Sequence, residues 1–237
     1  MPVSKTDFVR ATQCEKMLWL DSHRPDLKII PQEVQERLDA GNAFGDKAMS
    51  LFGPFVETTA YKADGRLDYA LMIERTKRLI EENCPVVCEG AFSWYGNYCA
   101  VDILRKTENG YAIYEVKNAT TPRREFILDL GFQRLILGKC GVKIESSMLL
   151  LRDDKTEEER GQVCVERIEK DGERYKIIDV TREAKIFERQ ANARVFEFGR
   201  IKKKDAPTPL VSVGEQCEKP YRCWYFEYCH KFLEKSE

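Results

Sequence analysis

The sequence contains no long hydrophobic run. Its longest wholly aliphatic stretch extends only from Met148 to Leu151, whereas a helix that crosses a bilayer needs roughly 20 apolar residues. The first seven residues, Met1 to Asp7, include no apolar signal region. We therefore expect a protein that has no membrane-spanning helix and resides in the cytoplasm.

The sequence also has almost no net charge. Its 39 Lys and Arg residues nearly balance its 40 Asp and Glu residues, so the formal net charge is −1. A polyanionic partner would therefore have to be held by a local basic surface, because the overall field is weak. Arg123 with Arg124, and Arg200 with Lys202–Lys204, are candidates for such a surface; solvated loop charges are the alternative. Aromatic residues that could stack on unpaired bases are Tyr95, Tyr98 and Tyr221.

Nine cysteines are present, but no two of them are spaced as Cys-x₂-Cys. An odd number of cysteines without a secretion signal argues against a disulfide scaffold and for thiols in a reducing compartment. Five of them are scattered among apolar residues and are expected to be small buried hydrophobes: Cys84, Cys88, Cys99, Cys140 and Cys164. The other four lie near the two ends of the chain and require another explanation.

Length and composition predict one folded domain. A chain of 237 residues with 43% hydrophobic and 33% charged residues can form one substantial core and is too hydrophobic to be disordered. We expect a single domain over residues 1–237, with a helical part at 1–85, a core at 86–200, and a linker and tail at 201–237.

Hydrophobic periodicity predicts an α/β fold with a mixed central sheet flanked by helices. Helices are expected at 4–18, 32–51, 67–82, 126–137 and 182–199. Strands are expected at 86–94, 98–104, 111–117, 144–152, 163–168 and 175–180.

Two carboxylates interrupt apolar strands of this sheet. Asp102 lies in Ala-Val-Asp-Ile-Leu and Glu115 in Ile-Tyr-Glu-Val-Lys, where an ionised group is costly unless it is paired or bound to a cation. Asn109-Gly110 predicts a hairpin turn between the two strands. A loop of two or four residues would place Asp102, Glu115 and Lys117 on one face of the hairpin, whereas a three-residue loop would separate them.

This arrangement would suit cleavage of phosphodiester bonds. The two carboxylates can hold Mg²⁺ or Mn²⁺, which activates water and neutralises charge on the phosphate, and Lys117 can stabilise the transition state. A structural ion pair is the alternative, because the acid-x-Lys pattern also occurs at Asp26-Leu-Lys28 and Asp153-Asp154-Lys155.

Three motifs together resemble the RecB-like branch of the PD-(D/E)XK nucleases. They are Asp102-Ile-Leu, Glu115-Val-Lys117, and Asp129-Leu-Gly-Phe-Gln133 on the helix that follows. The resemblance implies a restriction-endonuclease-like fold in which Gln133 completes a catalytic site of Asp102, Glu115 and Lys117.

The same resemblance implies further ligands for Mg²⁺ or Mn²⁺. Glu89 matches an acidic residue one strand earlier in some relatives, and the backbone carbonyl of Val116 is a second candidate. Two positions depart from the family pattern. Gly45 stands near the place of a helical metal-binding His, and Leu137 stands where a Tyr often follows the Gln. The missing His leaves one or two metal ions as alternatives.

The cysteines of the tail have an unusual spacing. Cys217, Cys223 and Cys229 are separated by five residues each, which does not match the common structural zinc patterns. Six residues of a helix turn through about 600°, so these thiols converge only if the segment is irregular. Cys14 is the candidate for a fourth ligand.

One cysteine near the N-terminus and three near the C-terminus, on either side of the nuclease motifs, resemble the iron–sulfur nucleases, including the CRISPR-associated RecB-like exonucleases. That resemblance implies a [4Fe–4S] cluster on Cys14, Cys217, Cys223 and Cys229 that joins the ends of the chain. Four thiolates also suit zinc, and cysteines without a metal are a third alternative.

The sequence therefore predicts a metal-dependent deoxyribonuclease, an exonuclease with or without endonuclease activity, that acts on single-stranded DNA or frayed ends. The resemblance implies trimming of DNA before spacer integration, with the CRISPR integration complex as partner. Processing of phage or mobile-element DNA fits the residues equally well. The alternative is an assembly module with a nuclease fold that binds DNA without cutting it and whose chain ends are held together by an iron–sulfur or zinc centre. An electron carrier is a third and weaker reading.

Overall fold

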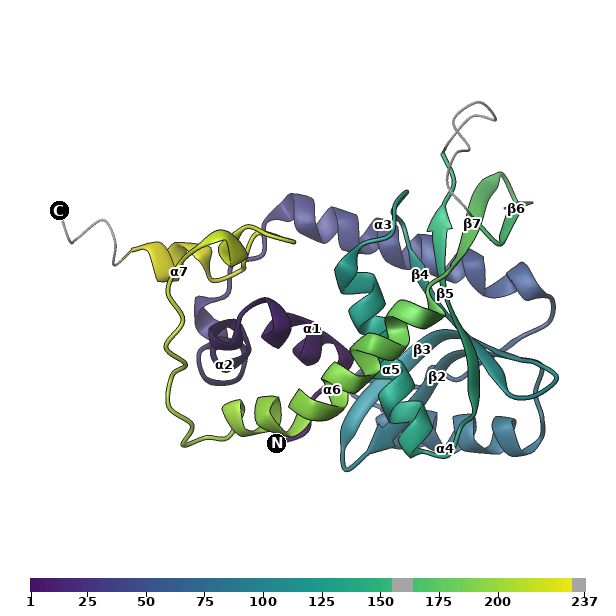
Figure 1. The fold of residues 1–237 in the computed structure, drawn as a ribbon, viewed down its shortest axis with the longest axis horizontal. Coiled ribbons are helices and arrows are strands. Elements are labelled where there is room, and N and C mark those ends of the chain that lie inside the picture. Colours follow the sequence, from purple (N-terminus) through teal and green to yellow (C-terminus); the bar gives the residue numbers. More distant parts are fainter. Residues whose placement is uncertain (155–163, 232–237) are drawn as a thin grey trace.

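A seven-stranded mixed sheet forms one side of the protein, on the right in Figure 1. The computed structural model describes residues 1–154 and 164–231. The sheet has the order β1-β2-β3-β4-β5-β7-β6, in which β1–β2 and β4–β5 are parallel and the other pairs are antiparallel. The strands are β1 (Val56–Glu57), β2 (Val86–Trp94), β3 (Asn97–Lys106), β4 (Tyr111–Lys117), β5 (Ile144–Arg152), β6 (Glu166–Lys170) and β7 (Glu173–Asp179).

The described part of the chain has seven α-helices. They are α1 (Lys5–Gln13), α2 (Glu15–His23), α3 (Gln32–Ala48), α4 (Tyr69–Glu81), α5 (Arg124–Lys139), α6 (Thr181–Ile201) and α7 (Phe226–His230). Five of them (α1, α3, α4, α5 and α6) contact strands of the sheet. Because β4 and β5 are parallel, a crossover must join them, and α5 provides it. The predicted class, an α/β fold with helices flanking a mixed sheet, is confirmed. None of the helices in the described ranges is both long and apolar enough to span a membrane.

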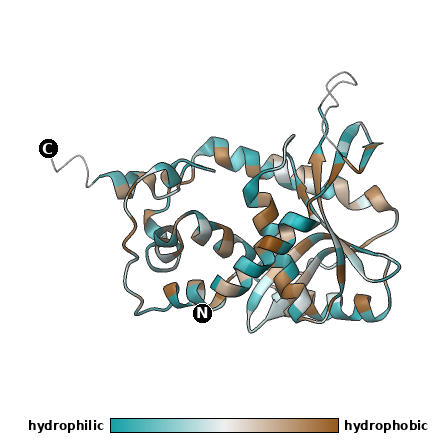
Figure 2. Ribbon diagram, viewed as in Figure 1, coloured by the Kyte–Doolittle hydropathy of each residue, from teal (hydrophilic) through white to brown (hydrophobic). Residues whose placement is uncertain are grey.

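The two faces of the sheet carry separate hydrophobic cores. Leu104 and Ile113 pack with α5 and α6 on one face, whereas Ile103 and Tyr114 pack with α3 on the other. Figure 2 shows hydrophobic residues gathered where α5 and α6 cross the sheet. Because the sheet and α6 cover α5 on two sides, nearly every side chain from 125 to 137 is buried, which explains why this helix has no polar stripe.

The helix expected at 4–18 is in fact two helices. Cys14 has an extended backbone (φ −159°, ψ 116°), ends α1 and precedes α2. Phe8 and Leu18 are buried as the periodicity predicts. The periodicity concealed the break because Cys14 falls on the same apolar stripe. Its carbonyl accepts the N–H of Met17 (3.0 Å) and so starts α2 in a new direction.

Other boundaries differ from the predictions by a few residues. The helix expected at 32–51 leaves the α conformation after Ala48 and continues as a 3₁₀ turn, Met49–Phe52. The strand expected at 163–168 is β6, at 166–170; Val163 itself lies outside the described residues. The two-residue β1 and five-residue α7 were not predicted, because they are too short for a periodic pattern.

Candidate functional site

The β3–β4 hairpin sets the position of the two strand carboxylates. Its loop is the four-residue segment Thr107 to Gly110, and β3 pairs with β4 so that Ile103 lies opposite Tyr114. In this register Asp102 and Glu115 are the next residues along the two strands. Since neighbouring strand residues face opposite sides, both carboxylates lie on the face that α5 covers, as one of the two predicted loop lengths requires.

Glu115 is fully buried and is held by three donors from three elements. Lys117 places Nζ 2.6 Å from Oε1. Lys5, the first residue of α1, places Nζ 3.1 and 3.0 Å from Oε1 and Oε2. The Nε2 group of Gln133 on α5 donates to Oε2. The structure therefore brings the predicted residues Glu115, Lys117 and Gln133 into contact, and Lys5 is a further residue of the site that was not predicted.

Asp102 completes the pair at a more accessible position. Its side chain is 24% exposed, its Oδ2 accepts the backbone N–H of Val116 (2.7 Å), and its Oδ1 lies 3.8 Å from Lys5 Nζ. Val116, whose backbone carbonyl is a predicted metal ligand, lines the cleft together with the carboxylates. Its contact with Asp102, however, is made by its backbone N–H and not by its carbonyl. Lys5 thus contacts both carboxylates of the pair.

Glu89 lines the same cleft from β2. It lies between the paired positions Cys88–Ile103 and Gly90–Val101, and its φ of 54° interrupts the ladder there. A positive φ is uncommon for a residue other than glycine, and such residues cluster at functional sites. The structure thus places Glu89 in the cleft with Asp102 and Glu115.

Asp129 is a further carboxylate of the site. Its Oδ2 lies 3.2 Å from Lys117 Nζ, and it precedes Gln133 by one helical turn on the same face of α5. Burial raises the pKa of Asp129 to about 6, although Lys117 acts in the opposite direction. Asp129 begins one of the three sequence motifs, but it was not among the predicted site residues. An acidic residue within the apolar run of α5 was a usable signal, similar to that of Asp102.

Burial and charge drive the carboxyl pKa values apart. Burial acts to raise the pKa of Glu115, but Lys117 and Lys5 outweigh it and lower that pKa to about 2. Burial and then Glu115 raise the pKa of Asp102. Burial, followed by the charge of Asp102, raises the pKa of Glu89 to about 8. Carboxyl groups so separated within one cleft are typical of functional sites.

The raised pKa of Glu89 predicts a pH-dependent stability. Its pKa in the folded protein, about 8, exceeds its ordinary value of 4.5, so its contribution to stability is complete below about pH 4.5 and is lost as the pH rises through 8. In EDTA, Glu89→Gln should melt about 5 °C above the parent at pH 8.5 and near it at pH 5. Equal melting temperatures of parent and variant across this range would contradict the assignment.

A large cleft of about 1410 Å³ opens beside these residues. Arg10, Arg37 and Arg123 line it together with residues of α3 and the tail, and so do several aromatic side chains. The aromatic residues among the lining are Tyr61, Tyr69, Tyr98, Tyr221, Trp224, Phe126 and Phe226. Tyr61 and Tyr69 are 67% and 50% exposed. The cleft therefore offers cations and ring faces next to the carboxylates.

The other four cysteines line a second, small cavity of about 20 Å³, which shares Met17, Cys223 and Phe226 with the wall of the cleft. Cys14, Cys217, Cys223 and Cys229 all contribute to its wall, with Met17 and Leu20 among the apolar neighbours. Burial raises the pKa of Cys223 to about 11, and the nearby thiols of Cys14, Cys229 and Cys217 act in the same direction. The irregular tail thus brings together the thiols that a regular helix would have separated.

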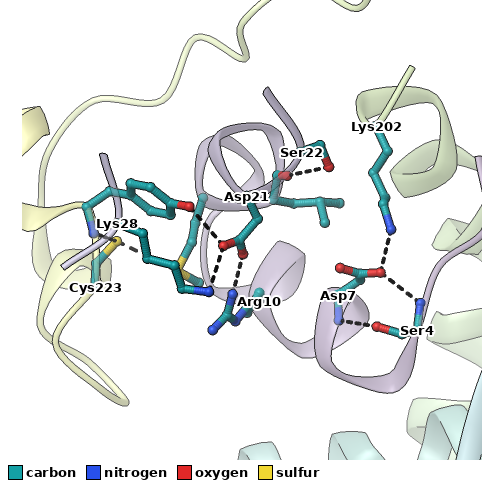
Figure 3. A network of polar contacts seen from close by, with 11 residues as sticks. Ser4, Asp7, Arg10, Asp21, Ser22, Lys28, Lys202 and Cys223 are labelled. Carbon is teal, nitrogen blue, oxygen red and sulfur yellow. Dashed lines mark hydrogen bonds and ion pairs between the residues drawn. The ribbon is translucent and has the colours of Figure 1, made fainter. Parts of the chain in front are cut away.

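Polar contacts fasten the tail to the first two helices. Asp21 accepts a hydrogen bond from Tyr225 Oη (2.9 Å) and forms ion pairs with Arg10 and with Lys28 (3.3 Å), and Cys223 lies against a sulfur of α2 (Figure 3). Gln13 Nε2 donates to the carbonyls of Gln216 and Tyr221, at 2.8 Å each. The tail therefore holds Cys217, Cys223 and Cys229 against Cys14.

Neither site presents a preformed ligand set for a single ion. Within residues 1–154 and 164–231, no three His, Cys, Asp or Glu side chains are placed to hold one metal ion as they stand. Mg²⁺ usually keeps several waters and takes only one or two carboxylates from a protein, so Asp102 and Glu115 form a chemically suitable pair. No family model matches the chain, and no curated protein matches it either.

Proposed function

We propose that this chain is a Mg²⁺- or Mn²⁺-dependent deoxyribonuclease with a RecB-like PD-(D/E)XK core. The observation that carries the proposal is the convergence of Asp102, Glu115, Lys117 and Gln133 on one face of the β3–β4 hairpin. The antiparallel β2-β3-β4 order, followed by α5 and the parallel β5, supports the proposed core.

Asp102 and Glu115 are the proposed ligands of the divalent ion, with Glu89 and the Val116 carbonyl as further candidates. When bound, such an ion activates water and neutralises charge on the phosphate. Gln133 keeps the Glu115 carboxylate oriented by donating to Oε2.

Lys117 is the residue proposed to stabilise the negative charge of the transition state. Burial acts to lower the pKa of Lys117, but Glu115 and Asp129 outweigh it and raise the pKa above its ordinary value. The ammonium therefore remains charged at neutral pH. This protonation state suits electrostatic stabilisation and disfavours a role as general base.

The lining of the cleft supports single-stranded DNA as the substrate. Unpaired bases bind by stacking on aromatic side chains, and the backbone binds to cations. Exposed Tyr61 and Tyr69 offer rings, and Arg37 lies over the ring of Tyr221 (5.5 Å). Paired bases would leave these rings without a stacking partner, so we propose single strands or frayed ends.

The arginines of the cleft provide a test of the proposal that single-stranded DNA binds along the cleft. Arg37→Ser combined with Arg123→Ser should weaken binding of single-stranded DNA about tenfold and reduce the slope of log affinity against log salt by about 1.4, because two phosphate contacts are lost. Fluorescence anisotropy in EDTA, which prevents cleavage, measures both quantities. Arg66→Ser, which removes a cation paired with Asp64, is the control and should leave both unchanged. Undiminished binding by the double variant would rule out the cleft as the binding site of single-stranded DNA.

A [4Fe–4S] cluster is the proposed occupant of the cysteine cavity. Zinc holds thiolates at about 2.3 Å, which requires sulfur atoms about 3.8 Å apart, and no such preformed set is found among the described residues. In the cluster each thiolate binds a different iron, so the sulfur atoms stand farther apart. The proposal is supported by the cavity that Cys14, Cys217, Cys223 and Cys229 share, because it brings all four required thiols to one place.

The wild-type protein tests the proposed activity directly. End-labelled single-stranded DNA should be shortened in Mn²⁺ or Mg²⁺ and remain intact in EDTA, and labels at each end reveal the polarity. Binding without cleavage under all these conditions would establish the alternative, a DNA-binding module on a nuclease fold. Trimming of DNA before CRISPR spacer integration and processing of phage or mobile-element DNA in the cytoplasm are the two proposed settings.

A further inference from the structure

Lys5 brings a positive charge to the carboxylates from a distant part of the chain. It begins α1 and lies 110 positions before Glu115. Its Nζ is 3.0 Å from Glu115 Oε2 and 3.8 Å from Asp102 Oδ1. The ammonium therefore contacts both carboxylates that we propose as ligands of a divalent ion.

The start of α1 is held firmly enough to fix this contact. The N–H of Tyr98 on β3 donates to the carbonyl of Val3 (3.1 Å). Ser4 and Asp7 form a reciprocal capping box, which satisfies free N–H groups of the first turn. Lys202 at the end of α6 places Nζ 2.6 Å from Asp7 (Figure 3). The backbone that carries Lys5 is thus fastened to β3 on one side and to α6 on the other.

The position of the Lys5 ammonium beside Glu115 has an electrostatic reason. Glu115 is fully buried, and a buried carboxylate is destabilising unless an opposite charge compensates for it. Lys117 provides part of that compensation, and Lys5 provides more. A divalent ion bound to Asp102 and Glu115 would compensate for the same charge. An ammonium and a dication repel each other strongly at such short range, so both cannot contact the pair as Lys5 does here.

We infer that Lys5 is a tethered cation that occupies the Asp102–Glu115 pair in the metal-free protein and competes with the divalent ion for it. This inference rests on the proposed function in that it takes the pair as the metal site. Lys5 then stabilises the metal-free fold and weakens metal binding, because its ammonium has to leave the carboxylates before the ion can bind.

Calorimetric titration with Mn²⁺, without DNA, tests the competition on the full chain. Lys5→Met keeps the length and apolar stem of the side chain but removes the charge, and it should bind Mn²⁺ at least about tenfold more tightly than the parent. Lys5→Arg keeps the charge and should bind as the parent does. Lys77→Met is the matched control, because it makes the same charge change on α4, where Lys77 pairs with Glu81 (3.8 Å) and does not line the cleft; its affinity should stay within about twofold of the parent.

Melting curves separate competition from a purely structural role. In EDTA, Lys5→Met should melt below the parent, and saturating Mn²⁺ should raise its melting temperature more than that of the parent. A structural role alone predicts weaker or unchanged Mn²⁺ binding, and either result overturns the inference. Lys5→Gln, which retains a hydrogen-bond donor, replaces Lys5→Met if that variant does not fold.

The outcomes also distinguish this inference from the proposed nuclease. Equal Mn²⁺ affinity of parent and Lys5→Met overturns the competition and leaves the nuclease intact. Tighter binding by Lys5→Met in a protein that cuts no DNA upholds the competition and overturns the nuclease. Mn²⁺ binding by none of the proteins overturns both.

Discussion

Asp102→Asn should lower Mn²⁺-dependent cleavage of single-stranded DNA at least about 1000-fold, and its melting temperature should stay within a few degrees of the parent. The substitution removes the negative charge that would bind the ion. It preserves an oxygen that can accept the N–H of Val116, which Asp102 Oδ2 now accepts at 2.7 Å. Because the side chain is already 24% exposed, the neutral amide introduces no new buried polar group.

Two comparisons make the result specific to the site. Asp64→Asn neutralises a carboxylate that pairs with Arg66 outside the cleft, and it should cut DNA at the parental rate. Glu115→Ala should also be inactive, but it should lose about 3 kcal/mol of stability as well, because Glu115 is buried and shared by Lys5 and Lys117. Cleavage by Asp102→Asn at the parental rate would show that this pair is not the metal site.

Cys223→Ala should have the largest effect on stability, lowering the melting temperature by about 10 °C and removing the brown colour of an iron–sulfur protein. Cys223 lines the cysteine cavity together with Cys14, although the two are far apart in the sequence. A metal centre formed on folding closes that long loop and stabilises the folded chain. The hydrophobic core of the tail is small: among the described residues of this segment, only Tyr225 is buried together with Met17 and Leu20 in the hydrophobic core beside the cysteines.

Metal analysis of anaerobically purified protein identifies the centre. About four irons with matching sulfide per chain support the cluster, and one zinc per chain would replace it with a zinc site. Absence of metal would exclude both. Cys140→Ala changes an exposed cysteine outside the cavity, so it should retain the metal, the colour and the melting temperature.

The sequence predicted the architecture because its periodic segments are long. The strands at 111–117 and 144–152 agree with the structure residue by residue, and the helix expected at 126–137 extends by only two residues at each end. These segments have a buried side or are buried all round, so their hydrophobic pattern follows their packing. Elements shorter than about two turns or three strand residues, such as β1 and α7, leave no comparable pattern.

The carboxylate site was only partly predictable, because some of its residues are neighbours on one hairpin and others meet only through tertiary packing. Asp102, Glu115 and Lys117 lie on one hairpin, where strand alternation and loop length decide which side chains meet. Lys5 reaches them through tertiary packing of α1, and no local pattern marks that contact. Cys14 was linked to the tail by its residue type. The break in the helix at Cys14 has no counterpart in the periodicity, because Cys14 falls on the same apolar stripe as its neighbours.

The positions of Lys5 and Cys14, far in sequence from their partners Glu115 and Cys229, also constrain the order in which the two sites can form during synthesis. Lys5 and Cys14 are made early, but α1 packs against α5 and α6, and Cys14 shares its cavity with Cys229. The ribosome must therefore produce the chain through α5 before the charged centre can assemble, and through Cys229 before the thiol cavity can assemble. Contacts between such distant segments form late in folding. A nascent chain that stops before α5 would lack the charged centre, and one that stops before the tail would lack the thiol cavity, so neither proposed centre is present early in synthesis.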